Sequence, residues 1–183
     1  FGSRRGNDRV MTRGTFANVR IKNLMVDGTE GGYTLYFGNR EIPAPDKNIP
    51  ASAGSPAFIY DAAMAYARDN TPLIVIGGED YGMGSSRDWA AKGTNLLGVK
   101  AVVTKSFERI HRSNLIGMGV LPLNFANKED YDRIAPLKDV TFSILGLNND
   151  ISPRQQVTLR VQPADAPAFD IPVVVRIDTP IEK

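Results

Sequence analysis

The middle of the chain alternates short apolar runs with segments whose apolar residues recur at helical spacing. The runs at residues 72–76, 99–104 and 120–125 have the length and composition of buried strands. Between them, the patterns at residues 88–97 and 106–116 predict helices, with Ser106 as the cap of the second. A strand–helix–strand–helix–strand order of this kind predicts parallel pairing with right-handed crossovers.

The residues before this segment carry weaker patterns. Residues 15–22 alternate between apolar and polar, which predicts a half-buried strand, and residues 33–37 predict another. Residues 43–56 are rich in Pro, Ala and Ser, so we expect an exposed and mobile loop there. Ser55 and Pro56 predict the start of a helix that continues to Arg68, since Ser can cap a helix and Pro suits its first turn.

The pattern in the last third of the chain predicts antiparallel strands. A short helix is predicted at residues 128–134, followed by strands at 140–145, 157–161 and 171–177. We expect these strands to form a second, small sheet. The predicted fold class is therefore α/β, with a mostly parallel central sheet, helices and a small additional antiparallel sheet. At 183 residues, we expect a single domain over residues 1–183.

Composition limits the chemistry that the chain can perform by itself. It has no cysteine and one histidine, His111, so it holds neither a thiolate nor a His-rich metal site. Any metal chemistry must be completed by another chain or domain. No apolar run approaches the roughly 20 residues that cross a bilayer, so we expect no membrane association. The lack of cysteine is consistent with a reducing compartment, and we expect the cytoplasm.

Charge is unevenly distributed, although the net charge is only +2. In residues 1–22 the single acid is Asp8, and the bases are Arg4, Arg5, Arg9, Arg13, Arg20 and Lys22. We call these six bases the basic strip. Such an excess suits an anionic small molecule or RNA phosphates, but it also describes a solvated edge, and charge alone leaves both interpretations open.

The most informative segment is the glycine-rich loop at residues 77–87, which joins a predicted buried strand to a predicted helix. In open α/β sheets, ligands bind at this kind of junction. Gly82 and Gly84 allow a ligand to approach the backbone closely, and the free N–H groups of a first helical turn favour an anion.

Three polar residues complete this loop. Ser85 and Ser86 add hydroxyl donors, and the planar guanidinium of Arg87 suits a carboxylate. Helix capping is the alternative, because Ser85 and Asp88 have the spacing of a capping box. Capping explains one serine but not the whole group, and the pattern alone leaves anion binding and capping open.

Familiar catalytic motifs do not describe the loop. Residues 82–87 lack the third glycine of a dinucleotide fingerprint and the Gly-Lys-Ser/Thr of a phosphate-binding loop. Asp88 breaks the Gly-x-Ser-x-Gly pattern of a nucleophile elbow. A Ser-His-Asp triad would have to use His111, which lies within a predicted helix, so we expect it to be structural.

Several blocks together resemble one family. They are GMGSSRDWAAKG at residues 82–93, SFERIHRSNL at 106–115, GMGVLPL at 117–123, GSRRGND at 2–8 and RGTFAN at 13–18. Their sequences are similar to those of the swivel domain of aconitases, in the branch of bacterial aconitase A and the iron-regulatory proteins. The chain begins at Phe1 rather than Met, and we interpret it as the C-terminal part of a longer enzyme.

The resemblance implies a swivelling β/β/α domain of the aconitase and isopropylmalate dehydratase superfamily. It implies reversible conversion of citrate to isocitrate through cis-aconitate, with a [4Fe–4S] cluster held by cysteines of the remaining domains. By position, Ser85 matches the serine base, while Arg5, Ser86 and Arg87 match residues that hold substrate carboxylates. Gly82 and Gly84 would support the anion-binding loop, and no metal ligand is expected in this chain, which should be inactive alone.

Three alternatives stay open at this point. A 2-methylcitrate or 2-methylaconitate hydratase of the aconitase type would share these blocks. A free-standing small subunit of an isopropylmalate dehydratase would explain a separate chain without cysteine. The basic strip would also permit an RNA-binding regulatory role, although no RNA-recognition motif with interleaved aromatic residues is present.

Overall fold

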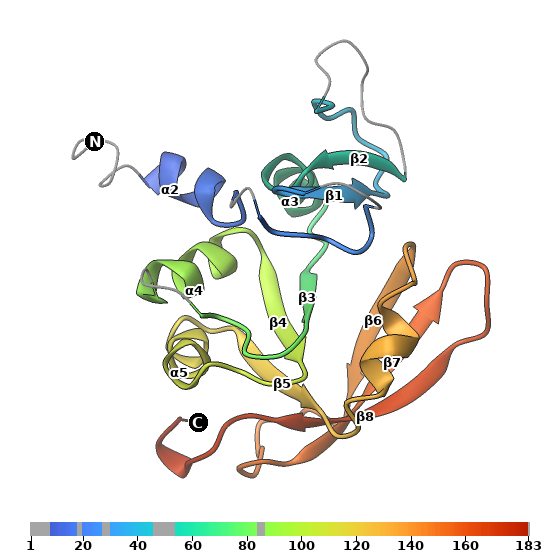
Figure 1. Ribbon diagram of the computed structural model, residues 1–183. Coiled ribbons are helices and arrows are strands. Elements are labelled where there is room, and N and C mark those ends of the chain that lie inside the picture. Colours follow the sequence, from blue (N-terminus) through green and yellow to red (C-terminus); the bar gives the residue numbers. More distant parts are fainter. Residues whose placement is uncertain (1–7, 18–19, 27–29, 46–53, 84–86, 183) are drawn as a thin grey trace. The chain divides into compact units, whose positions relative to one another are not determined.

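The computed structural model describes residues 8–17, 20–26, 30–45, 54–83 and 87–182 (Figure 1). Of residues 8 and 87 it describes the backbone only. The chain separates into two compact units. The first comprises Phe1–Leu73 with Leu96–Gly98, and the second comprises Ile74–Asn95 with Val99–Lys183. A single domain over residues 1–183 stays a prediction.

The first unit packs one helix against a two-stranded antiparallel sheet. Its elements are α2 (Asp8–Gly14), β1 (Tyr33–Tyr36), β2 (Ser55–Phe58) and α3 (Ile59–Arg68). Alanines on α3, such as Ala62 and Ala65, are buried and let the helix approach β1 and β2 closely. The fully buried Tyr36 fills the centre of this cluster, and its hydroxyl oxygen accepts a hydrogen bond from Arg40 N at 3.1 Å.

Two predictions for the first unit are wrong. Residues 15–22 form a turn after α2 rather than a strand, apart from an isolated bridge between Lys22 and Glu30, and residues 18–19 lie outside the described residues. Ser55 and Pro56 belong to β2, and the helix begins only at Ile59. Pro56 is tolerated because each strand of a two-stranded sheet has one unpaired side. Most of the predicted mobile loop at 43–56 also lies outside the described residues, and its mobility stays a prediction.

The second unit is built on a six-stranded sheet with the order β3-β4-β5-β8-β7-β6 (Figure 1). Its strands are β3 (Leu73–Gly77), β4 (Val99–Thr104), β5 (Leu121–Phe125), β6 (Val140–Leu145), β7 (Gln156–Pro163) and β8 (Phe169–Val175). Its helices are α4 (Arg87–Leu96), α5 (Arg109–Gly117), α6 (Asp130–Ile134) and the 3₁₀ helix η1 (Pro180–Glu182). The prediction of strand, helix, strand, helix and strand is therefore confirmed, with β4 and β5 parallel.

Alternation along the long strands explains the core. On β7 the buried residues are Val157, Leu159, Val161 and Pro163, separated by more exposed ones, and β8 shows the same period. Apart from Pro163, they form one apolar cluster with Leu123 and Phe125 of β5. Period-two burial is what a sheet with one face on the core requires.

The α/β class is confirmed, but the arrangement of the tail strands is corrected. They do not form a separate sheet, because β8 pairs antiparallel with β5, with Leu123 opposite Val175. β6 and β7 then extend the same sheet, which is mixed rather than mostly parallel. The small antiparallel sheet is instead the pair β1 and β2. Among the helices of the described ranges, none has the length and apolar character to cross a bilayer.

Candidate functional site

The candidate site lies in the second unit, at the edge of the sheet where parallel strands end and loops begin. β4 and β5 are parallel, with Thr104 beside Asn124, so both strands end at the same edge. The loop that follows β3 is joined to this edge, since Lys105 N and Ser106 N both donate to Gly78 O, at 3.1 and 3.4 Å. The glycine-rich loop thus lies where open α/β sheets bind ligands.

Hydrogen bonds fix the first part of the glycine-rich loop to the segment between β4 and α5. Tyr81 N donates to Ser106 O at 3.0 Å, and Glu108 N donates to Tyr81 O at 2.9 Å. Asp80 has φ of 50°, a left-handed conformation that Asp tolerates better than most residues. Its N–H donates to Ser106 Oγ at 2.7 Å, which supports that conformation.

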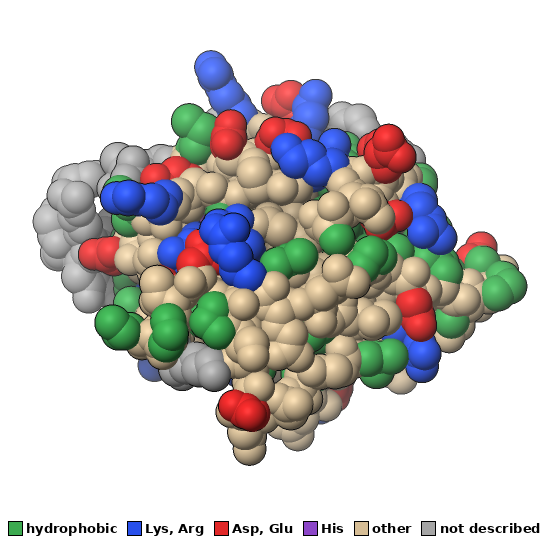
Figure 2. All heavy atoms as spheres, turned by 90° about the horizontal axis from the view of Figure 1, so that it is seen from below, with side chains coloured by type: hydrophobic (Ala, Val, Ile, Leu, Met, Phe, Trp, Pro, Cys, Tyr) green, Lys and Arg blue, Asp and Glu red, His purple; other side chains and the backbone are tan. Residues whose placement is uncertain are grey.

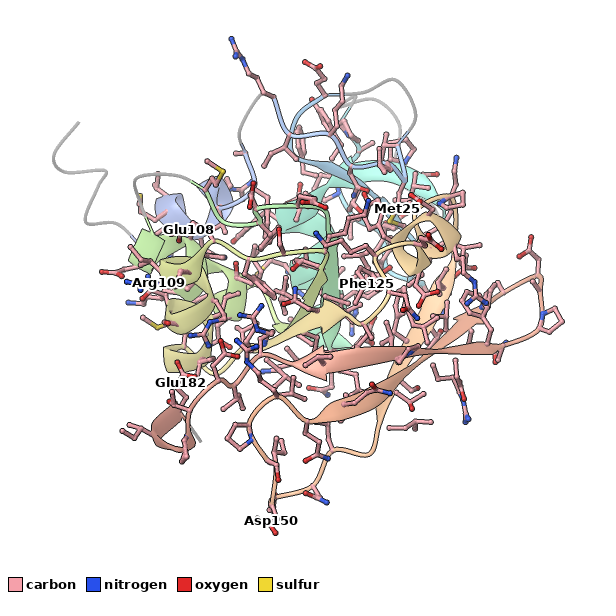
Figure 3. All side chains as sticks on the ribbon, turned by 60° about the horizontal axis from the view of Figure 1, so that its bottom comes forward. Met25, Glu108, Arg109, Phe125, Asp150 and Glu182 are labelled. Carbon is pink, nitrogen blue, oxygen red and sulfur yellow. The ribbon has the colours of Figure 1, made fainter. Side chains whose placement is uncertain are left out.

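Ser106 is therefore not the helix cap that the sequence predicts. Helix α5 begins at Arg109, and its cap is Glu108, whose carboxylate accepts from His111 N at 2.9 Å. Figure 3 shows Glu108 and Arg109 at this start of α5. Sequence reasoning missed Glu108 because a carboxylate at this position is a weaker capping signal than serine. The serine is used instead to hold the loop.

Gly82 lies directly on the ring of His111. Its φ is 100°, in the region that favours glycine, and a Cβ at this position would overlap the imidazole carbons. His111 is 2% exposed, and its Nδ1 is buried without a hydrogen-bond partner among the described residues. Burial lowers the pKa of His111, while the charge of Glu108 acts in the opposite direction. This burial agrees with a structural role for His111, which stays a prediction.

Tyr81 fills the space between the loop and α5. Its ring lies 5.5 Å from that of His111 and 6.1 Å from that of Phe107, measured between centroids. Burial raises the pKa of the Tyr81 phenol, so this group stays protonated and is unsuited to act as a base. Its contribution is packing.

Helix α4 starts at Arg87 and is tied to α5 by a separate contact. The Asp88 carboxylate accepts a hydrogen bond from Asn114 Nδ2 at 2.9 Å. This contact fixes the first turn of α4, which carries the backbone of Arg87. The guanidinium of Arg87 lies outside the described part of the chain.

The structure places only part of the predicted site. Gly82 lies in the described loop, whereas Arg5, Gly84, Ser85 and Ser86 lie outside the described residues. The roles expected of Arg5, Ser85 and Arg87 therefore stay predictions. Within the described ranges, no group of three or more His, Asp or Glu residues could hold a metal ion.

A buried ionic network lies next to this edge, and sequence reasoning did not find it. Arg112 on α5 is 7% exposed, and its guanidinium donates to Arg176 O at 2.8 Å and to Glu182 Oε1 at 3.1 Å. Asp178 receives hydrogen bonds from Arg176, which in turn donates to Asn124 at the end of β5. Figure 3 shows Glu182 beside α5, so the segment after β8 is bound to the helix that supports the loop.

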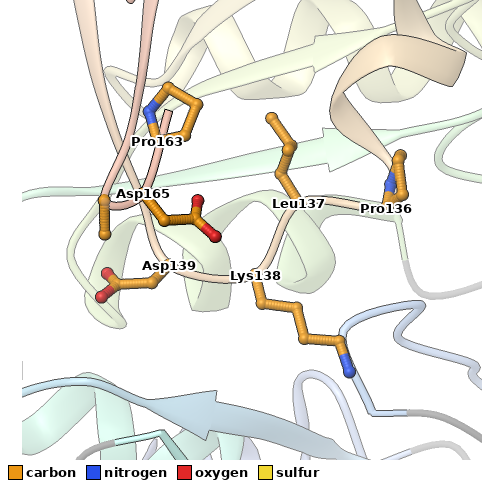
Figure 4. Close-up of a pocket in the computed structure, with 7 residues that line it drawn as sticks. Pro136, Leu137, Lys138, Asp139, Pro163 and Asp165 are labelled. Atoms are coloured by element: carbon orange, nitrogen blue, oxygen red, sulfur yellow. The ribbon is translucent and has the colours of Figure 1, made fainter. Parts of the chain in front are cut away.

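A hollow of about 460 Å³ opens elsewhere in the second unit (Figure 4). It is lined by Pro136, Leu137, Lys138, Asp139, Pro163, Ala164 and Asp165. The carboxylates of Asp139 and Asp165 lie on one side, and the Lys138 side chain extends away from them. None of the residues singled out from the sequence lines this hollow.

Several described members of the basic strip are engaged within the first unit. Lys22 pairs with Glu30 at 3.2 Å, and Arg13 stacks on Tyr60 at 4.2 Å. Arg9 and Arg20 also have interactions of their own. On the face seen in Figure 2, basic side chains lie among acidic ones, so the described residues there form no patch of a single sign.

The fold and the loop define the class as an α/β domain with a glycine-rich strand-to-helix loop at the edge of its sheet. A sequence model of the family described as Aconitase C-terminal domain matches residues 1–128, and the chain belongs to this family. The match includes the glycine-rich loop and ends before β6.

Known relatives align with the chain over nearly its whole length. Aconitate hydratase A of Deinococcus radiodurans is 55% identical over 182 residues, and that of Thermus thermophilus is 50% identical over 182 residues. Both alignments cover 100% of this chain and 18% of the relative, so the chain spans less than a fifth of these proteins. A solved 3-isopropylmalate dehydratase of Methanocaldococcus jannaschii is 19% identical, with a TM-score of 0.37 over 79% of this chain and 76% of that one.

Proposed function

We propose that the chain is the domain of an aconitate hydratase that supplies the base and the carboxylate-binding residues for interconversion of citrate and isocitrate. The main support is the family match over residues 1–128, which contains the whole loop from Gly77 to Arg87. The relatives named aconitate hydratase A support it further, since they align across the entire chain.

The proposed reaction breaks a C–H bond next to a carboxylate. The proton passes to Ser85 Oγ, the electron pair forms the double bond of cis-aconitate, and the hydroxyl group leaves the neighbouring carbon as hydroxide. Hydroxide then adds to the carbon that lost the proton, and Ser85 returns a proton to the carbon that lost the hydroxyl group, which gives the isomer and regenerates the alkoxide. Because such a proton is only weakly acidic, the base must be strong, and a serine alkoxide meets this need when its own charge is compensated.

The surroundings of the loop can compensate that charge. The N–H groups at the start of α4 and in the glycine-rich segment favour an anion, and the guanidinium groups of Arg5 and Arg87 add positive charge. The same two arginines, with Ser86, would hold substrate carboxylates through charge-assisted hydrogen bonds. In this proposal Gly84 gives a substrate access to the backbone, whereas Gly82 is required by its left-handed conformation and by its close contact with His111.

The [4Fe–4S] cluster of the family cannot be ligated by this chain, because the chain has no cysteine. The proposal therefore places the cluster and its ligands in other domains, and assigns no step of this chain's chemistry to it. The isolated chain should bind no iron–sulfur cluster and show no turnover. A cytoplasmic location is part of the same proposal.

A chimera tests the proposal directly. The matching segment of the Deinococcus radiodurans aconitate hydratase A is replaced by residues 1–183, and formation of cis-aconitate from citrate and isocitrate is followed by ultraviolet absorbance. We expect turnover, and we expect Ser85→Ala to lower kcat by about 10²- to 10⁴-fold, the usual contribution of a general base.

Ser143→Ala on the exposed face of β6 is the matched control and should leave kcat unchanged. Full turnover by the Ser85→Ala chimera would refute the base assignment. A chimera that folds and carries its cluster but acts on 2-methylcitrate rather than citrate would instead favour the methylcitrate alternative.

A further inference from the structure

The contact between Gly82 and His111 indicates a role for His111, which takes no part in the proposed chemistry. The ring of His111 lies so close to Gly82 that no side chain could be inserted between them. The backbone of His111 is held in the first turn of α5, because its N–H donates to the carboxylate of Glu108, and the ring is 2% exposed. A rigid helix therefore presents a flat surface to the loop.

This surface is the last described support of the loop before the proposed base. Among the hydrogen bonds between described residues, the series that fixes the loop ends with Glu108 N to Tyr81 O. Met83, one residue beyond Gly82, is 75% exposed. At Gly82 the described backbone is therefore constrained by its left-handed conformation and by the imidazole ring against which it packs.

We propose that His111 is a positioning residue whose buried ring fixes the backbone of the loop at Gly82, three positions before the proposed base. This inference rests on the proposed function only for the identity of the reaction, since the packing contact stands by itself. The nitrogen Nδ1 has no partner among the described residues. The ring therefore acts through its shape, and another flat ring should replace it.

The expected kinetic effect follows from this arrangement. His111→Ala removes the support and lets the loop shift, and a misplacement of about 1 Å can cost about 100-fold in rate. The loss should fall on kcat rather than KM. The reason is that Asn114 holds the first turn of α4, with Arg87, through a different contact. His111→Phe keeps a ring under Gly82 and should restore most of the lost kcat.

The first test is made on the 183-residue chain and needs no activity. Amide hydrogen exchange is measured for Asp80 and Tyr81 and compared with Val102 and Val103 of β4. We expect His111→Ala to speed exchange at the loop amides by about tenfold or more, a change that local loosening readily produces. His111→Phe should not do so, and the β4 amides should be unchanged in both variants. Unchanged loop exchange in His111→Ala would overturn the inference.

The second test uses the active chimera. Leu115→Ala is the matched control, because Leu115 is equally buried on α5 and lies a turn away from the Gly82 contact. It should lower stability without the fall in kcat seen with His111→Ala. If the two variants lose kcat equally, or if His111→Phe is as slow as His111→Ala, His111 is only structural.

A double variant probes the contact itself. Gly82→Ala clashes with the ring, and His111→Ala removes that clash although the left-handed strain at residue 82 remains. The losses of kcat should therefore be less than additive, whereas additive losses would contradict direct coupling. If the chimera shows no turnover at all, the exchange results still decide the role of His111, so failure of the proposed function is distinguishable.

Discussion

Gly77 and Gly78 are neighbours in the chain, yet their surroundings predict opposite responses to the same substitution. A Cβ on Gly77 would lie 2.7 Å from Tyr81 Cδ2 and 3.0 Å from Thr104 Cγ2, whereas one on Gly78 would meet nothing within 4 Å. We therefore expect Gly77→Ala to destabilise the chain by about 1–3 kcal/mol through overpacking. Gly78→Ala should be close to neutral. Urea denaturation of both variants checks this pair, and equal stabilities would show that Tyr81 is loosely packed.

Asp178 predicts how stability changes in acid. Hydrogen bonds from Arg176, with smaller contributions from Arg112 and Arg154, lower the pKa of Asp178 to about 2 from 3.8. Because the folded state holds the ionised form more strongly, this stabilisation is fully present above pH 3.8 and is lost as pH falls towards 2. In Asp178→Asn, the free energy of unfolding should change less over this pH window. An unaltered acid profile would show that Asp178 is not the group responsible.

Some features of single residues could be predicted from the sequence and others could not. The glycine-rich loop stands out from its own composition, whereas the burial of His111 could not be predicted, because Ile110 next to it on the same helix is 41% exposed. The exchange of roles between Ser106 and Glu108 could not be predicted, because it depends on Asp80 in a loop 26 positions earlier in the chain. Local patterns also cannot show whether Arg5 lies near Ser85, 80 positions away in the chain, and this proximity stays a prediction.

At the scale of elements, α5 is held by an ionic network that differs in kind from the pairs on the sheet surface. The side chain of Arg112 is 9% exposed beside Asp178 and Glu182, whereas Arg160 and Asp170 are 49% and 45% exposed. Removing one partner from a buried pair leaves an unpaired charge and costs about 3–5 kcal/mol, while an exposed pair that solvent screens contributes little. Chemical denaturation should therefore separate Arg112→Ala clearly from Arg160→Ala. Similar losses would mean that the network is well hydrated.

Elements were predicted best where their signal is local. β4 and β6 begin and end at the predicted residues, and the helix predicted at 88–97 is α4 at Arg87–Leu96. The partner of β8 was missed because alternation along a strand shows which face is buried but not which strand lies beside it. The segment at β2 was mistaken for a helix start because Ser and Pro favour both a helix terminus and the unpaired side of a short strand.

For the whole molecule, RNA binding by the basic strip is the remaining prediction from the sequence that differs in class from catalysis. The pairing of Lys22 with Glu30 and the stacking of Arg13 reduce the charge available to phosphates. We expect a gel shift with hairpin RNA to be weak and to disappear as salt rises, as nonspecific phosphate contacts do. A tight complex that survives high salt would instead support the regulatory alternative, and Lys22→Ala should then weaken it.

The position of β8 has a consequence for how the protein is made. This strand is the last of its sheet to be synthesised, yet it lies between β5 and β7. Until it leaves the ribosome, β5 and the β6–β7 hairpin each expose an unpaired edge, the kind of surface that promotes aggregation. The growing chain therefore cannot close its core in the order in which it emerges. A nascent polypeptide stalled before residue 169 should need a chaperone, whereas the released 183-residue chain should not.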